Sequence, residues 1–152
     1  MKKIFSILTA AVLFMTPVSA LTDTEAKEIA EKYVPAGSTY VETETEHGKS
    51  EVGFVKGNYE YEVTISSKGK VLEVEKDCIK KAGGKSFVLT KAEAKAKVKK
   101  AFKGAKITDI EKKKTKKDGC YYEIEFKTPA YRGEAKVNAE TGKITEYEKE
   151  YN

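Results

Sequence analysis

The sequence predicts an α+β protein of two similar units, each with one helix packed on a four-stranded antiparallel sheet. Residues 89–103 repeat the apolar pattern of residues 21–34 and share some of its residue types, and both segments are predicted to be helices. Each is followed by short segments in which apolar and polar residues alternate, which is the period of a strand with one buried face. We expect the two sheets to join into one continuous sheet with both helices on one face. Two separate units are the alternative.

Residues 1–20 have the pattern of a cleavable secretory signal peptide. Lys2 and Lys3 precede an apolar run at 4–15, and the small residues Ser19 and Ala20 end the segment. The apolar run is shorter than the roughly 20 residues that a membrane-spanning helix needs. We therefore expect an extracytoplasmic chain, periplasmic or secreted, with no transmembrane segment after removal of the signal.

The two predicted helices begin in the same way. Thr22 with Glu25, and Thr90 with Glu93, have the spacing of a capping box, in which the two side chains satisfy free amides of the first turn. Proline or glycine then ends both segments. The apolar faces consist of Ala26, Ile29, Ala30, Tyr33 and Val34 in the first helix and Ala94, Val98, Ala101, Phe102 and Ala105 in the second. Each helix should therefore lie on an apolar surface, which we expect to be a sheet.

Eight strands are expected after the two helices. The first repeat, residues 21–77, should contain strands at 39–46, 51–56, 59–66 and 70–76. The second repeat, residues 89–152, should contain strands at 106–114, 120–128, 131–138 and 143–149. Residues 78–88 hold a glycine pair and several lysines, and are expected to form the linker.

The two repeats resemble the PepSY family. The motifs that carry the resemblance are the Leu-Thr-x-x-Glu-Ala helix openings at 21–30 and 89–98, the strands at 61–65 and 134–137, and the closing hairpins at 69–74 and 142–147. The resemblance covers nearly all of the mature chain. One departure is the Ser66-Ser67-Lys68-Gly69 turn, where the second repeat has the usual Glu140-Thr141-Gly142.

The resemblance implies a binding module without catalytic residues. PepSY domains occur in propeptides of secreted metallopeptidases and in small exported proteins, and are thought to bind and restrain peptidases. We therefore expect this chain to bind or inhibit a secreted peptidase or another exported enzyme, as a monomer or weak oligomer. The predicted architecture is also similar to that of exported β-lactamase inhibitor proteins, which hold their target on the open face of a sheet.

Charge is distributed unevenly along the chain. Residues 21–77 contain 7 basic and 13 acidic residues, whereas residues 78–152 contain 20 basic and 11 acidic residues. A nucleic-acid-binding protein would not usually carry so acidic a half, and an exported location argues against that partner. The lysine-rich run at 112–117 leaves a second function open, in which the basic repeat docks on an anionic wall polymer or membrane.

Few residues suggest catalysis, a metal site or a cofactor. His47 is the single histidine and lies in an expected turn, so it is interpreted as a surface residue. One histidine and two distant cysteines lack the paired spacing of a zinc site. Glu42, Glu44 and Glu46 alternate on one strand face, where they favour a soluble sheet edge over a cation site. We expect no enzyme activity, no metal and no cofactor.

The two cysteines of an exported protein can pair. Cys78 lies at the end of the first repeat and Cys120 at the start of a strand in the second, and an oxidising compartment favours a disulfide between them. Two free thiols are the alternative.

The strand alternation also predicts where a partner binds. Tyr61, Val63 and Ile65 should face the helix, so their neighbours should face the other way. The resulting candidate partner-binding residues are Glu60, Glu62, Glu73, Glu75, Arg132, Glu134 and Lys136. We expect this helix-free sheet face to be polar and net acidic, and to receive a basic patch of an exported protein. Tyr121 and Tyr151 are expected to be exposed.

Overall fold

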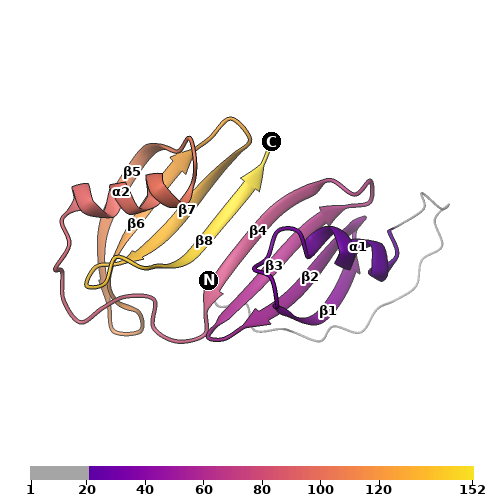
Figure 1. The fold of residues 1–152 in the computed structure, drawn as a ribbon, viewed down its shortest axis with the longest axis horizontal. Coiled ribbons are helices and arrows are strands. Elements are labelled where there is room, and N and C mark those ends of the chain that lie inside the picture. Colours follow the sequence, from indigo (N-terminus) through magenta and orange to yellow (C-terminus); the bar gives the residue numbers. More distant parts are fainter. Residues whose placement is uncertain (1–20) are drawn as a thin grey trace.

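The computed structural model describes residues 21–152, and the expected signal peptide at 1–20 lies outside the described residues. These residues form two helices and eight strands, with each helix followed by four strands, as the repeat pattern predicts (Figure 1). The first repeat contains α1 (Asp23–Ala30), β1 (Thr39–Glu46), β2 (Lys49–Lys56), β3 (Tyr59–Ser66) and β4 (Val71–Cys78). The second contains α2 (Lys91–Ala101), β5 (Lys106–Thr115), β6 (Gly119–Lys127), β7 (Tyr131–Asn138) and β8 (Ile144–Tyr151).

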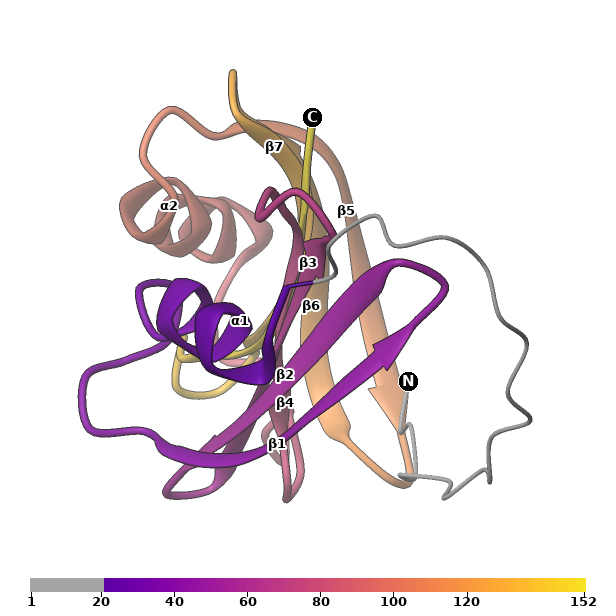
Figure 2. The ribbon, with the colours of Figure 1, turned by 90° about the vertical axis from the view of Figure 1, so that its right-hand side faces the viewer.

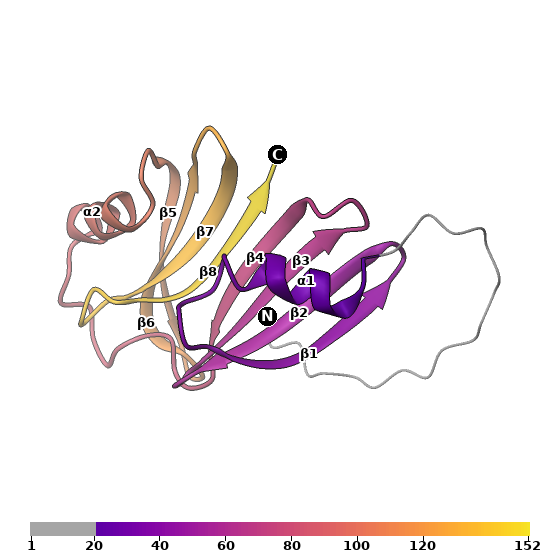
Figure 3. The same ribbon diagram turned by 45° about the vertical axis from the view of Figure 1, so that its right-hand side comes forward.

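All eight strands belong to one antiparallel sheet, with the order β1-β2-β3-β4-β8-β7-β6-β5. The two repeats join where β4 pairs with β8, so the last strand of each repeat lies at the centre of the sheet (Figures 1 and 3). The α+β class and the single continuous sheet are therefore confirmed. The outer strands β1 and β5 form the two edges, and each contains a register shift next to its neighbour.

Both helices begin with the expected capping box. The Thr22 hydroxyl accepts from the Glu25 amide, and the Glu25 carboxylate accepts from the Thr22 amide at 2.9 Å. Thr90 and Glu93 repeat this arrangement, with the corresponding amide-to-carboxylate distance at 2.7 Å. Both helices are shorter than the apolar patterns predict. The first, α1, ends ahead of Pro35 in the sequence, and Gly104, with φ of 80°, turns the chain after α2.

Each helix packs on its own half of the sheet and forms a separate core. The core of the first repeat contains Ala26, Ala30, Val52, Phe54, Tyr61, Val63, Ile65, Val71 and Val74. The core of the second contains Ala94, Val98, Phe102, Cys120, Tyr122, Ile124, Phe126, Ala135, Val137 and Ala139. Tyr147 on β8 packs against both clusters and joins them across the junction. Ala101, expected on the apolar face of the second helix, is exposed.

Figure 2 shows α1 and α2 on the same side of the sheet. The strand register at the junction agrees with this view. Val74 belongs to the core beneath α1, and its partner on β8 is Lys149. The Lys149 ammonium in turn lies 5.5 Å from the ring centroid of Phe102, the residue that caps α2. The other face of the sheet carries no helix in the described chain.

A tight turn explains why β2 begins two residues earlier than expected. His47 and Gly48 both have positive φ, at 50° and 73°, and Glu46 pairs directly with Lys49. Two-residue hairpin loops with this backbone match the twist of the paired strands, so β2 can start directly after the turn. The side chain of His47 is almost fully exposed, which agrees with its interpretation as a surface residue.

Candidate binding face

The helix-free face of the sheet carries a row of acidic residues that crosses six adjacent strands. Each member is the direct cross-strand partner of the next, because the two repeats join in register at β4 and β8. The row, named here the acidic row, consists of Glu62, Glu75, Glu148, Glu134, Glu125 and Asp109. Neighbouring strands lie about 4.8 Å apart, so like charges are held next to one another along its length.

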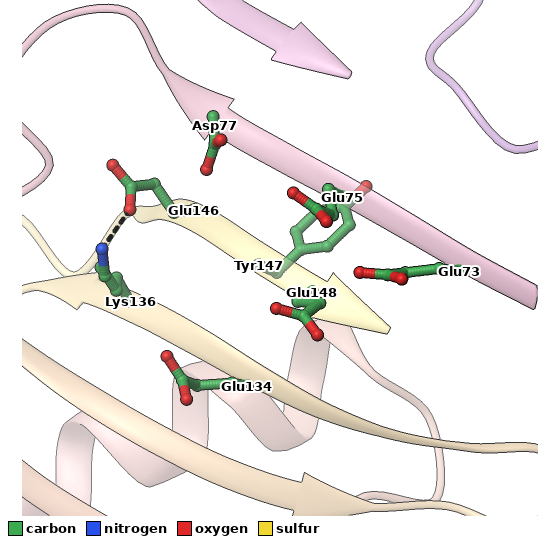
Figure 4. A pocket seen from close by; sticks show the side chains of 8 residues that line it. All are labelled: Glu73, Glu75, Asp77, Glu134, Lys136, Glu146, Tyr147 and Glu148. Carbon is green, nitrogen blue, oxygen red and sulfur yellow. Dashed lines mark hydrogen bonds and ion pairs between the residues drawn. The ribbon is translucent and has the colours of Figure 1, made fainter. Parts of the chain in front are cut away.

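A shallow hollow lies at the centre of this face, where the two repeats meet (Figure 4). Its volume is about 170 Å³, and it is lined by Glu73, Glu75 and Asp77 of β4, Glu146, Tyr147 and Glu148 of β8, and Glu134 and Lys136 of β7. Six carboxylates and a single lysine therefore surround it. A cationic group fits this hollow better than an anionic or apolar one.

The environment of the hollow disfavours the charged form of several of these acids. Partial burial raises the pKa of Glu148, and the nearby carboxylates of Glu75 and Glu150 raise it further. Partial burial likewise raises the pKa of Glu134, with Glu123 adding to the effect. The pKa of Asp77 is raised by burial and then by Glu146. A cation bound here would relieve this repulsion.

Two ion pairs offset part of the negative charge at the border of the hollow. The Lys136 ammonium lies 2.5 Å from a carboxylate oxygen of Glu146, and both side chains are largely buried (Figure 4). Arg132 donates from Nε to Glu150 at 2.6 Å. These two cations are therefore already paired within the face, and the carboxylates of the hollow outnumber them.

Three carboxylates of the hollow lie close enough to share a ligand. Oxygen atoms from Glu73, Glu75 and Glu148 lie within 4.8 Å of one another. Carboxylate oxygens of this kind suit a hard cation such as Ca²⁺. Exposed acidic groups often lie this close without an ion, so the cluster by itself does not define a metal centre.

The structure brings together only some of the residues predicted for the partner-binding face. Glu73, Glu75, Glu134 and Lys136 line the hollow. Glu62 belongs to the acidic row, whereas Glu60 pairs across the strands with Asp77 nearer the end of the sheet. Arg132 lies beyond the hollow and pairs with Glu150.

Asp77 was not among the candidates, because in the sequence it precedes the linker and extends a strand that was expected to end at Lys76. Its alternation with Glu73 and Glu75 is the signal that would have found it.

Tyr121 corrects a prediction on this same face. It was expected to be exposed but is buried, with 6% of its surface accessible. It pairs with Asn138, and the Lys136 ammonium lies 5.5 Å from its ring centroid. The Tyr121 ring is buried on the polar face because the long Lys136 side chain covers it. Strand alternation predicts only the direction of a side chain, and so it does not predict this cover. Tyr151 is half-buried.

The expected disulfide between Cys78 and Cys120 is not formed in the structure, where both cysteines are free thiols. Cys78 ends β4 and Cys120 lies on β6, which is three strand positions away in the sheet. Three strand spacings amount to about 14 Å. A disulfide needs Cα atoms within about 7 Å, so a bridge would require backbone movement. The oxidation state in the exported protein stays a prediction.

A family model of the PepSY domain, described as peptidase propeptide and YPEB domain, matches residues 20–78 and 88–148. The chain therefore belongs to the PepSY family and contains two tandem copies of its domain. The two matched ranges correspond closely to the two halves of the sheet. A search of curated proteins finds no significant match.

Several solved structures are similar over most of the chain. A candidate lipoprotein from Clostridium difficile 630 is 22% identical, with 84% of this chain and 91% of that chain covered and a TM-score of 0.39. A BLIP-like protein from Bacteroides fragilis NCTC 9343 is 13% identical, with 88% and 91% covered and a TM-score of 0.35. The YpeB C-terminal domain of Bacillus megaterium is 15% identical, with 87% and 66% covered and a TM-score of 0.36.

Within residues 21–152 the structure has no helix that is both long enough and apolar enough to cross a membrane.

Proposed function

We propose that this chain is an exported, non-catalytic binding module that holds a secreted peptidase or another exported enzyme on the helix-free face of its sheet. The observation that carries the proposal is the acidic row, which presents carboxylates from six adjacent strands on one rigid surface. Membership of the PepSY family supports a binding role over a catalytic one. The same proposal includes the export of the chain and the placement of both helices on one face of the sheet, which leaves the other face open to a partner.

The chemistry of the face selects a basic patch on the partner. The hollow is lined by six carboxylates and Lys136. The ammonium of Lys136 is already paired with Glu146, and the guanidinium of Arg132, beyond the hollow, is paired with Glu150. Partial burial raises the pKa of Glu134 and Glu148, so a partner cation gains by stabilising their charged forms. A continuous antiparallel sheet is also ordered before binding, which keeps the ordering cost of association low.

The test uses a pair of charge reversals on the face and a matched pair elsewhere. Glu75→Lys with Glu134→Lys alters the acidic row, whereas Glu28→Lys with Glu31→Lys makes the same charge change on and after α1. Immobilised protein is exposed to the exported fraction of the source cells, a captured enzyme is identified, and its association with each variant is measured at several salt concentrations.

We expect the Glu75/Glu134 variant to associate about tenfold more slowly and with a weaker salt dependence, because charges at an interface steer association. The Glu28/Glu31 variant should associate as the unmodified chain does. The assignment of the face is wrong if the Glu28/Glu31 variant loses binding and the Glu75/Glu134 variant keeps it. The peptidase proposal is wrong if the exported fraction yields no enzyme that binds.

A further inference from the structure

We propose that a second surface, on the helix side of the second repeat, docks on an anionic phospholipid bilayer. This surface, named here the basic corner, consists of Lys85, Val88, Lys91, Lys112 and Lys114. It lies on the opposite side of the sheet from the acidic row, and it goes beyond the enzyme-binding role proposed above.

The basic corner belongs to the most cationic stretch of the chain. Residues 79–117 contain 15 lysines and three acidic residues, and of these lysines only Lys113 forms a salt bridge among the described residues. Glu93 is engaged in the capping box of α2. Asp109 and Glu111 pair across the strands with Glu125 and Glu123, on the helix-free face. The helix side of this stretch is therefore cationic with almost no compensating charge from within it.

Several contacts bring the corner lysines together from three parts of the chain. The Lys91 ammonium donates to the carbonyl of Ile110 on β5 at 3.3 Å. Lys112 places its ammonium 4.1 Å from the ring centroid of Phe87 in the linker. Lys114 is the cross-strand partner of Cys120, whose thiol donates to the Lys85 carbonyl at 3.5 Å. Linker, helix start and edge strand thus contribute to one surface.

An exposed apolar residue, Val88, lies in the chain between Lys85 and Lys91 and directly follows Phe87, whose ring the Lys112 ammonium covers. Val88 is 66% exposed, more than any other large apolar residue of the described chain. Its position is nevertheless well defined, because its backbone amide donates to the Ala139 carbonyl at 3.0 Å and Leu89 donates to the same carbonyl at 2.9 Å. The preceding residue, Phe87, packs edge-on against Tyr122 in the core of the second repeat. Val88 is therefore held outward by a fixed backbone.

The combination of lysines around an exposed apolar side chain distinguishes a bilayer from other anionic partners. Lysines near an anionic membrane surface each contribute about a fivefold gain in affinity. An apolar side chain adds to binding only where it can leave water, as it does at the boundary between headgroups and acyl chains. A soluble polyanion offers no such environment to Val88. The Glu140 carboxylate accepts a hydrogen bond from the Lys85 amide at 2.8 Å, so one acidic side chain adjoins this surface.

The experiment measures sedimentation of residues 21–152 with vesicles of phosphatidylcholine, with and without phosphatidylglycerol. The test variant combines Lys91→Glu, Lys112→Glu and Lys114→Glu. The control combines Lys32→Glu, Lys49→Glu and Lys68→Glu, three exposed lysines of the first repeat that give the same change in net charge. Val88→Ser tests the apolar contact separately, and circular dichroism verifies that each variant is folded.

We expect binding only to vesicles that contain phosphatidylglycerol, with a loss on the order of a hundredfold in the Lys91/Lys112/Lys114 variant. The Lys32/Lys49/Lys68 variant should bind much more tightly than the test variant. Val88→Ser should weaken vesicle binding several-fold and leave binding to soluble polyphosphate unchanged. The proposal is overturned by absence of vesicle binding, by equal losses in the two lysine variants, or by unchanged vesicle binding of Val88→Ser.

Discussion

The two repeats have the same fold, but the solvent-facing sides of their helices carry charges of opposite sign. Both begin with a Thr-x-x-Glu capping box and both bury two alanine or valine residues of the helix against the sheet. The helix α1 carries Asp23, Glu25 and Glu28 against Lys27, whereas α2 carries five lysines between 91 and 101 and the single acid Glu93. The comparison shows that capping and packing maintain the PepSY unit, while the solvent side of the helix is free to change sign.

The two proposed functions use opposite sides of one sheet, the acidic row on the helix-free face and the basic corner on the helix side of the second repeat. The acidic row needs both repeats, because Glu75 comes from the first and Glu148 and Glu134 from the second. The basic corner needs only the second repeat and the linker that leads to it. A partner enzyme and a bilayer could therefore be bound at the same time.

The largest expected effects on stability concern two buried phenylalanines, one in each repeat. Phe54 and Phe126 occupy equivalent places on β2 and β6, with 1% and 2% of their surface accessible. Phe126 also stacks on Phe102, with ring centroids 4.5 Å apart. Substitution of either by alanine should cost about 3–5 kcal/mol, with Phe126→Ala the more damaging. Urea denaturation measures both. A smaller loss for Phe126→Ala would show that the stacked pair adds no stability.

Two strand glycines should respond differently to a methyl group. A Cβ at Gly133 would lie 2.7 Å from the Glu148 carbonyl oxygen and 2.7 Å from Phe126 Cζ, whereas a Cβ at Gly53 would meet nothing closer than 3.8 Å. Gly133→Ala should therefore cost about 1–3 kcal/mol through overpacking at the β7–β8 pair. Gly53→Ala should be neutral or stabilise by up to about 1 kcal/mol. Thermal unfolding of the two variants compares them directly, and equal melting temperatures would contradict the packing argument.

The capping boxes provide a comparison in which no difference is expected. Thr22→Ala and Thr90→Ala each remove a hydroxyl that accepts from the N3 amide at 3.3 Å. Each should cost about 1 kcal/mol, because the geometry is the same in both repeats. Chemical denaturation gives the two values. A much larger cost for one repeat would show that its helix is the less securely packed of the two.

The smallest expected effect is a gain in stability on mild acidification. Glu134 and Glu148 have raised pKa values in the folded chain, so the folded state binds protons more tightly than the unfolded state. Lowering the pH from 7 toward about 5 should therefore raise the free energy of unfolding by a few tenths of a kcal/mol, since partial exposure screens the effect. The gain is complete once the pH is below the unfolded pKa of about 4.3.

Capping limits this gain at lower pH. Hydrogen bonds from Thr22 and Thr90 lower the pKa of Glu25 and Glu93 in the folded chain. The stability that these two acids contribute is therefore present above their unfolded pKa, and it is lost as the pH falls through their pKa values in the folded chain. Thermal unfolding from pH 7 to 3 should therefore show a maximum near pH 5. Glu148→Gln should flatten the rise, whereas the exposed substitution Glu28→Gln should leave it in place.

Local pattern was sufficient for the elements of this fold. The capping boxes and strand alternation predicted two helices and eight strands, and β1, β3 and β7 have the predicted bounds. Alternation also assigned Glu73, Glu75 and Glu134 to the helix-free face, because successive strand residues point to opposite sides. The predictions are wrong where something other than strand alternation determines burial or the start of a strand. Tyr121 is buried beneath a lysine side chain, and β2 begins at once after a two-residue turn.

By itself the sequence determined that this protein is a tandem pair of PepSY units with an acidic first half and a basic second half, since helix caps, strand period and charge are properties of neighbouring residues. Only the tertiary structure decided that β4 pairs with β8, and with what register. That pairing aligns Glu75 with Glu148 and makes one acidic row from two repeats. It also separates Cys78 from Cys120 by three strand positions. Contacts between strands distant in the chain depend on how whole sheets meet, and no local pattern specifies that junction.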